Sequence, residues 1–230
     1  MGVDWNLVER AARTGAAFLR LYRWDPPCLS FGRNEPANTH YDRAAIERRG
    51  LDVVRRPTGG RAVWHEHEVT YAVAAPIAAF GSLRAAYCAI HERLAAALRQ
   101  LGLDPTLAPT RPTARPSDAG SCFDAPAGGE VLVGGRKVVG SAQVRHGTAV
   151  MQHGSILLDG SQRTLSAISR QPSPDSQASN LSEALGRPVA FAEVAQAIRD
   201  AWGAPLALAA AEQFQPQTAQ FADPDWTWRR

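Results

Sequence analysis

The chain has 230 residues, 45% hydrophobic and 20% charged, which is enough for one domain with a sizeable buried core. Its net charge of +3 at pH 7 is too small to indicate nucleic-acid binding by itself, although it would suit an acidic protein partner. The start, MGVDWNLVERAAR, has no apolar region of the kind found in signal peptides, and the longest apolar run is too short to span a bilayer. Three cysteines without a C-x-x-C pair argue against a disulfide framework, so we expect a cytoplasmic protein.

Apolar residues at steps of three and four predict helices, and short β-branched runs between glycines predict strands. The expected helices are residues 41–50, 83–102 and 191–203. The expected strands are residues 51–57, 61–65, 69–75, 129–135, 136–143, 148–152 and 154–159. Gly134 and Gly135 are typical of a tight hairpin turn between two of these strands.

Two stretches have no periodic apolar pattern. Residues 104–121 are rich in Pro, Ser and Thr and are predicted to be a loop, and residues 169–180 are expected to be irregular. Loops of this length are often functional. Because one sheet needs the strands on both sides, we expect a single mixed α/β domain over residues 1–230, its sheet flanked by helices, with a helical tail from about residue 185.

The first candidate site is RRPTGGRAVWHEHE, residues 55–68. Gly59 and Gly60 would let the backbone approach a ligand closely and present its N–H groups. Arg56 and Arg61 could bind phosphate or carboxylate. An ordinary hairpin turn with exposed arginines would explain the segment equally well.

Two histidines in this segment, His65 and His67, raise the question of a metal. On one strand both side chains would face the same side. No cysteine or carboxylate pattern completes a known zinc spacing, so we expect no metal and a half-exposed strand edge with one histidine packed inward.

Cys122 ends the long polar loop, within SCFDAPAGGE. Its polar and turn-forming neighbours favour an accessible thiol, whereas Cys28 and Cys88 are expected to be small buried hydrophobes. A reactive cysteine needs a cation or a helix N-terminus nearby to lower its pKa.

Lys137 follows fifteen residues later and is the only lysine among the 25 Lys and Arg residues. A surface cation tolerates arginine, whereas a site that needs a compact ammonium does not, so Lys137 is a candidate partner for Cys122. A solvated surface charge is the alternative. The next segment, MQHGSILLD, places His153 and Gly154 at the start of an apolar strand and is a weak signal alone.

In this order, RRPTGGRAVWH, CFDAP, GGRKVVGSAQ and QHGSILLD resemble the biotin/lipoate protein ligase superfamily, over about residues 20–160. The CFDAP element, and Arg61 where ligases usually have a third glycine, are similar to the cysteine-dependent octanoyl-acyl carrier protein:protein N-octanoyltransferases. The stretch FGRNEPAN (31–38) is more similar to the ATP-dependent lipoate–protein ligases of the same fold.

The resemblance implies a reaction without a cofactor. Octanoyl would pass from octanoyl-acyl carrier protein to Cys122 as a thioester, and then to a lysine of a lipoyl-accepting protein such as the glycine-cleavage H protein. Lys137 would stabilise the thiolate, and apolar strand side chains would form a tunnel for the tail. The candidate substrate-binding residues are Arg56, Gly59, Gly60, Arg61, His65, Gly140, Ser141, Ala142, His153 and Gly154. We expect a monomer without nucleic-acid or membrane partners.

Three alternatives stay open. A lipoate–protein ligase would need ATP and Lys137 but not Cys122, and an amidotransferase of the superfamily would use the cysteine with another lipoylated protein as donor. A non-catalytic module that binds carrier protein or nucleic acid would need neither residue.

The two ends of the chain also differ from parts of the superfamily. MGVDWNLVE enters at the Met of the usual N-M-A-L-D-E-A-L-L element, with Trp5 in place of Glu, so we expect an upstream start or a sheet without an edge strand. DPDWTWRR resembles the short W-x-x-R endings of the transferases, and we expect no ligase accessory domain.

Overall fold

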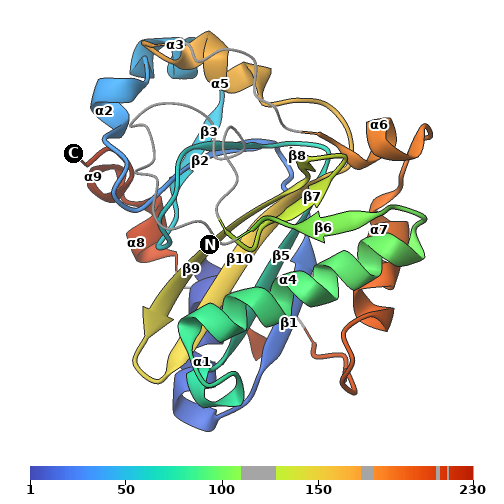
Figure 1. The fold of residues 1–230 in the computed structure, drawn as a ribbon. Coiled ribbons are helices and arrows are strands. Elements are labelled where there is room, and N and C mark those ends of the chain that lie inside the picture. Colours follow the sequence, from blue (N-terminus) through green and yellow to red (C-terminus); the bar gives the residue numbers. More distant parts are fainter. Residues whose placement is uncertain (110–127, 172–178, 211–212, 217, 230) are drawn as a thin grey trace.

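The structure is a computed structural model that describes residues 1–109, 128–171, 179–210, 213–216 and 218–229 (Figure 1). Its main sheet is antiparallel, in the strand order β1 (Phe18–Tyr22), β5 (Glu68–Pro76), β10 (Ala149–Leu157) and β9 (Val139–His146). The expected α/β class with a mixed sheet flanked by helices is confirmed.

The two faces of the main sheet have different coverings. Side chains alternate between faces along each strand, and residues directly opposite one another share a face. Val69, Tyr71 and Ile156 lie on the face that packs against α4 (Leu83–Gln100) and α7 (Phe191–Asp200), where they form the largest core cluster. Figure 1 shows α4 crossing this face. Ala74 and Met151 lie on the opposite face and pack against α1 (Gly2–Thr14).

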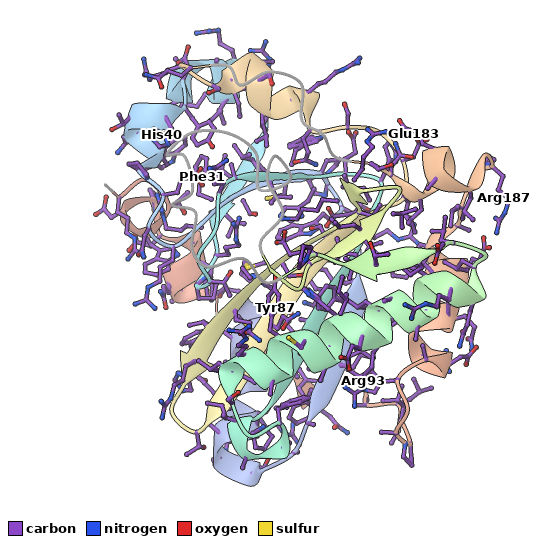
Figure 2. The ribbon with its side chains drawn as sticks, in the orientation of Figure 1. Phe31, His40, Tyr87, Arg93, Glu183 and Arg187 are labelled. Carbon is purple, nitrogen blue, oxygen red and sulfur yellow. The ribbon has the colours of Figure 1, made fainter. Side chains whose placement is uncertain are left out.

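A second, small sheet lies beside the main one and has the order β3 (Asp52–Arg55), β2 (Cys28–Phe31) and β4 (Val63–His65), with β2 and β3 parallel. Its own core includes Phe31, Tyr41, Ile46, Trp64 and Leu165. Short helices surround this sheet: α2 (Ala37–His40), α3 (Arg43–Arg48), α5 (Arg163–Ile168), α8 (Ala219–Ala222) and α9 (Pro224–Thr227). Side chains fill the space between these layers (Figure 2).

The third sheet is antiparallel and joins β6 (Pro105–Leu107), β7 (Val131–Val133) and β8 (Arg136–Lys137). Gly134 and Gly135 form the β7–β8 turn with φ of 56° and 76°, the left-handed conformation at both central positions that the hairpin requires. The predicted hairpin is therefore confirmed. The remaining elements are the 3₁₀ turn η1 (Ile77–Ala79) and α6 (Leu181–Leu185).

Several predicted boundaries are wrong. The loop expected at 104–121 contains strand β6. Pro105 is tolerated in this strand because β6 lies at the edge of its sheet, where the missing N–H of proline removes no hydrogen bond of the ladder. The two strands expected at 148–152 and 154–159 are one strand, β10, through which Gly154 continues the pairing opposite Ser141. Residues 203–210 carry no helix between α7 and α8.

Within the described residues, no helix is both long enough and apolar enough to cross a membrane.

Candidate active site

Seven of the ten candidate substrate-binding residues border one cavity between the main sheet and the β2–β4 sheet. They are Arg56, His65, Gly140, Ser141, Ala142, His153 and Gly154. Gly59, Gly60 and Arg61 lie in the loop beside this cavity. The strand register explains the grouping, because Ser155 pairs with Gly140 and His153 pairs with Ala142 across β9 and β10.

Arg56 holds the Gly59–Gly60 loop in place. It is 4% exposed, and its guanidinium donates to the carbonyls of Gly59 (3.2 and 3.1 Å), Ser30 (3.1 Å) and Arg61. The fork that could bind phosphate is therefore occupied by backbone oxygens. The expectation of exposed arginines at a simple turn is wrong for this residue.

The loop also needs glycine at its contact with the end of β2. A Cβ added to Gly32 would lie 1.7 Å from the carbonyl oxygen of Gly60, so only glycine fits there. Gly60 itself has φ of 89°, in the left-handed region. Close backbone approach, which the Gly-Gly pair suggested, occurs here between two parts of the chain.

Two buried charged residues that were not predicted from the sequence hold the segments next to this loop together. Arg55 is fully buried and donates to the carbonyls of Gly32 (2.6 Å), Glu35 (2.7 Å) and Thr227 (3.0 Å), so it joins the 32–35 segment to α9. The carboxylate of Glu35 accepts from the N–H groups of Gly32 (3.1 Å) and Ala62 (3.0 Å). The Arg-Arg doublet and the FGRNEPAN stretch were the available signals.

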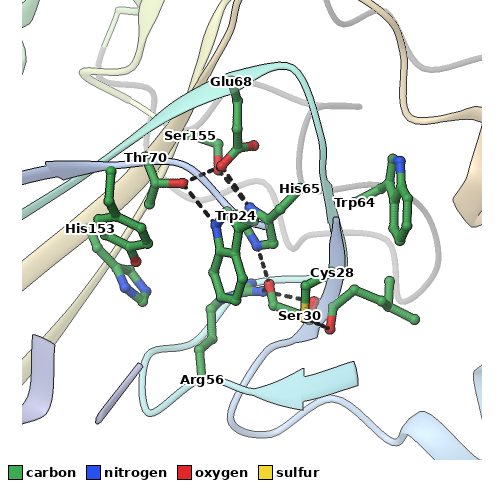
Figure 3. Close-up of polar contacts among 12 residues, drawn as sticks. Trp24, Cys28, Ser30, Arg56, Trp64, His65, Glu68, Thr70, His153 and Ser155 are labelled. Atoms are coloured by element: carbon green, nitrogen blue, oxygen red, sulfur yellow. Dashed lines mark hydrogen bonds and ion pairs between the residues drawn. The ribbon is translucent and has the colours of Figure 1, made fainter. Parts of the chain in front are cut away.

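His65 belongs to a buried hydrogen-bonded chain of side chains (Figure 3). Its Nδ1 lies 2.8 Å from Glu68 Oε1, and its Nε2 lies 2.7 Å from Ser30 Oγ. Glu68 Oε1 also accepts from Ser155 (3.0 Å) and Thr70.

These contacts fix the direction of each bond along the chain. His65 Nδ1–H donates to the carboxylate of Glu68, which leaves Nε2 to accept from the Ser30 hydroxyl. Ser30 in turn accepts from Arg56 at 3.0 Å. Ser30 is 0% exposed, so this Ser–His–Glu order forms a buried polar wall of the cavity, in which Glu68 Oε2 has no hydrogen-bond partner among the described residues.

The expectation of one histidine packed inward is confirmed for His65, which is 5% exposed, but the two histidines do not share a face of one strand. Strand β4 ends at His65, and His67 lies in the following turn with φ of 36° and an exposed side chain. The indole of Trp24 instead stacks on the ring of His65, at 4.5 Å between centroids. In the described part of the chain, no group of three or more His, Cys, Asp or Glu side chains is placed to hold a metal ion.

His153 connects the same loop to the N-terminal helix. Its Nε2 lies 2.6 Å from Thr58 Oγ1, and its Nδ1 lies 3.8 Å from a carboxylate oxygen of Asp4, too far for a hydrogen bond. Burial lowers the pKa of His153, so the ring is neutral at pH 7. Burial alone would raise the pKa of Asp4, but the N-terminal amine and the Arg20 guanidinium, 2.6 Å away, outweigh it and hold that pKa below its ordinary value.

Lys137 is not a surface charge. Its ammonium lies 2.7 Å from Glu130 Oε1, and the two side chains are 3% and 4% exposed. Cys122, its expected partner, lies in residues 110–127, outside the described residues. Of the other cysteines, Cys28 is buried with its pKa raised to about 12 mainly by that burial, and Cys88 is partly buried.

Comparisons with known proteins agree with this geometry. The family model described as lipoyl protein ligase A/B catalytic domain matches residues 1–203. The octanoyltransferase LipM of Kyrpidia tusciae is 43% identical over 85% of this chain and 71% of its own length. The octanoyltransferase LipM of Moorella thermoacetica is 42% identical over 74% of this chain and 68% of its own length.

Two solved structures show the same fold. Lipoate-protein ligase A bound with ATP superposes with a TM-score of 0.72 and 22% identity, over 87% of this chain and 77% of that chain. Ta0514, a lipoate protein ligase homologue from T. acidophilum, superposes with a TM-score of 0.74 and 20% identity, over 98% of this chain and 92% of that chain. The chain therefore belongs to the lipoyl protein ligase A/B catalytic-domain family and, within it, to the LipM octanoyltransferases, which are acyltransferase enzymes.

Proposed function

We propose that this chain moves octanoyl from octanoyl-acyl carrier protein, through a thioester on Cys122, to a lysine of a lipoyl-accepting protein such as the glycine-cleavage H protein. Family membership supports octanoyl transfer and excludes the non-catalytic binding module. The observation that carries the cysteine mechanism is the single lysine, buried at 3% exposure, with CFDAP fifteen residues before it.

The first step exchanges one thioester for another. The Cys122 thiolate attacks the carbonyl of the carrier thioester, the carbon–sulfur bond to the carrier breaks, and the carrier sulfur leaves as a thiolate. The Lys137 ammonium stabilises the thiolate before attack and the developing oxyanion during it. A thiol nucleophile needs a reducing environment, which supports action in the cytoplasm.

The second step forms an amide. The acceptor amine attacks the octanoyl carbonyl and loses a proton, and the Cys122 sulfur leaves as a thiolate that is ready for the next cycle. Amides are more stable than thioesters, so this step runs downhill and needs no ATP.

We assign the octanoyl tail to the cavity between the two sheets. The tunnel that we expected to be apolar has polar residues in its wall, but Arg56, His65 and Ser30 direct their polar groups to one another. Their hydrogen bonds to one another leave mostly apolar surface facing the cavity, which has a volume of about 30 Å³ in this structure and would have to widen to take the whole tail. Each buried CH₂ contributes about 0.8 kcal/mol to binding, so the depth of the cavity selects chain length.

The test is incubation of the purified protein with octanoyl-acyl carrier protein, followed by intact mass measurement. Wild-type protein and a Cys88→Ala control should gain one octanoyl group, and Cys122→Ala should gain none. A Cys122→Ala variant that still octanoylates H protein would overturn the mechanism, and ATP-dependent use of free octanoate would indicate a ligase instead.

Lys137→Arg tests the role of the lysine separately. It keeps the charge, but the planar guanidinium cannot occupy the buried site of a compact ammonium 2.7 Å from Glu130. We expect acyl transfer at least about tenfold slower than wild type, the loss that follows from about 1.4 kcal/mol of transition-state stabilisation. Full activity would show that Lys137 has another role.

A further inference from the structure

His91 lies in the middle of α4 and is completely buried. Its Nδ1 is 2.7 Å from the carbonyl oxygen of Gly129, and its Nε2 is 2.8 Å from Ser141 Oγ. From the sequence, this residue is predicted only to lie within the 83–102 helix. Both ring nitrogens are engaged, and they contact two segments that flank Lys137 in the sequence.

The direction of these two bonds can be worked out. Burial, together with the charge of Lys137, lowers the pKa of His91 to about 4, so the ring is neutral at pH 7 and carries one N–H. A carbonyl oxygen can only accept, so that N–H is on Nδ1 and donates to Gly129. Nε2 is therefore an acceptor, and the hydroxyl of Ser141 donates to it.

The chain of hydrogen bonds continues across the main sheet. The hydroxyl of Ser141 has used its proton, so it accepts from the Tyr71 hydroxyl at 2.6 Å. Tyr71 in turn accepts from the side-chain amide of Gln152 at 2.9 Å. An oriented chain of hydrogen bonds thus runs from β10 through β5 and β9 to α4, and ends on the carbonyl of Gly129.

Gly129 immediately precedes Glu130, the buried partner of Lys137. Gly129 has φ of 88°, and a Cβ added to it would lie 3.6 Å from the ring of Tyr87 and 3.8 Å from Cys88 Sγ, so this backbone is packed against α4. Tyr87 lies on α4 (Figure 2), the helix that carries His91. Its hydroxyl is 3.5 Å from Glu130 Oε1. Helix α4 is therefore connected to Glu130 in two ways. It contacts the backbone of the preceding residue, Gly129, and it contacts the Glu130 carboxylate.

We infer that His91 is a positioning residue for Lys137: it holds the Gly129–Glu130 backbone so that the Glu130 carboxylate places the ammonium. This rests on the proposed function, in which Lys137 stabilises the Cys122 thiolate. The attraction between two charges falls as their separation grows, so a displaced ammonium stabilises the thiolate less. His91 touches no reacting atom and acts only through the position of Lys137.

The experiment measures the rate of Cys122 alkylation by iodoacetamide against pH, by intact mass, in a Cys28→Ala and Cys88→Ala background. Lys137→Met should raise the pH of half-maximal rate by about one unit, the size expected when a neighbouring cation is removed. His91→Phe should raise it in the same direction. His91→Gln, which keeps a donor and an acceptor, should lie nearer to the wild-type curve, and His40→Phe on α2 is the matched control that should coincide with it.

The double variant decides whether His91 acts through Lys137. Adding His91→Phe to Lys137→Met should cause no further shift, and additive shifts would overturn the inference. If Lys137→Met shifts the curve but neither His91 variant does, the positioning role is wrong and the proposed function stands. If Lys137→Met leaves the curve unchanged, the proposed pairing with Cys122 fails, and the inference fails with it. If His91→Phe does not fold, the smaller His91→Leu replaces it: a shift in the direction of Lys137→Met that is absent from the double variant supports the inference, and a curve that coincides with wild type overturns it.

Discussion

Gly154→Ala should destabilise the protein severely, although it adds a single methyl group. Gly154 lies opposite Ser141 in the β9–β10 ladder. A Cβ at this position would lie 2.2 Å from the carbonyl oxygen of Gly140, 2.7 Å from Cε1 of Tyr71 and 2.9 Å from Ser141 Oγ. The carbonyl belongs to the neighbouring strand, so it can move only if the two strands separate.

The size of the effect follows from these contacts. Extra methyl groups in well-packed interiors cost about 1–3 kcal/mol, and the cost is highest where backbone has to move. We expect a loss of about 3 kcal/mol in the free energy of unfolding. For a chain of this length that corresponds to a fall of roughly 6–12 °C in melting temperature.

Urea and thermal denaturation followed by circular dichroism measure this change. Gly59→Ala is the matched control, because no atom lies within 4 Å of its added Cβ and Gly59 is not among the positive-φ glycines. It should stay within about 1 kcal/mol of wild type. If Gly154→Ala also stays within that range, the strands adapt to a Cβ and the packing argument is wrong.

Three further predictions concern buried charges and titrating groups. Arg55→Met should lower the free energy of unfolding by about 3–5 kcal/mol, because the carbonyls of Gly32 and Glu35 lose charged donors; a urea midpoint equal to wild type would contradict it. His91 has a folded pKa of about 4 against 6.5 unfolded, so the unfolded chain takes up a proton first and wild type should lose about 3 kcal/mol as pH falls through this window. His91→Phe should lack this loss, and parallel stability–pH curves for the two proteins would refute the assignment. The lowered pKa of Asp4 gives stability that is present above about pH 4 and lost below it, so the advantage of wild type over Asp4→Asn should shrink on acidification; urea melts at pH 7, 4 and 3 test this.

Local pattern was enough for the elements with strong periodicity. The 83–102 helix is observed as Leu83–Gln100, with Ser82 accepting from Ala85 N–H at its start. The ordered motifs also contain most of the residues that border the cavity. They lie together because β9 and β10 pair in the register that places Gly140 beside Ser155 and Ala142 beside His153. Sequence order and strand alternation carry this information directly.

The partners of the site residues could not be predicted in the same way. His65 meets Ser30 across 35 residues, and Arg55 meets Thr227 across 172 residues, so no local spacing reveals either contact. Strand β1 was missed because its five residues are all half-buried and show no alternation. His91 did have a signal: it lies four residues after Tyr87, one of the residues that define the apolar face of its helix.

Side chains alternate along β10, so the residues that face the cavity can be changed separately from the residues that face α4. His153 and Ser155 point into the cavity, whereas Gln152 and Ile156 point toward α4 and the main core. A combinatorial library at positions 142, 153 and 155 would therefore vary the wall of the cavity without changing the side chains that pack against α4, although changes at 153 and 155 would also remove the contacts to Thr58 and Glu68. Under the proposed assignment of the octanoyl tail to this cavity, such a library is a route to transferases that accept longer, shorter or tagged acyl chains.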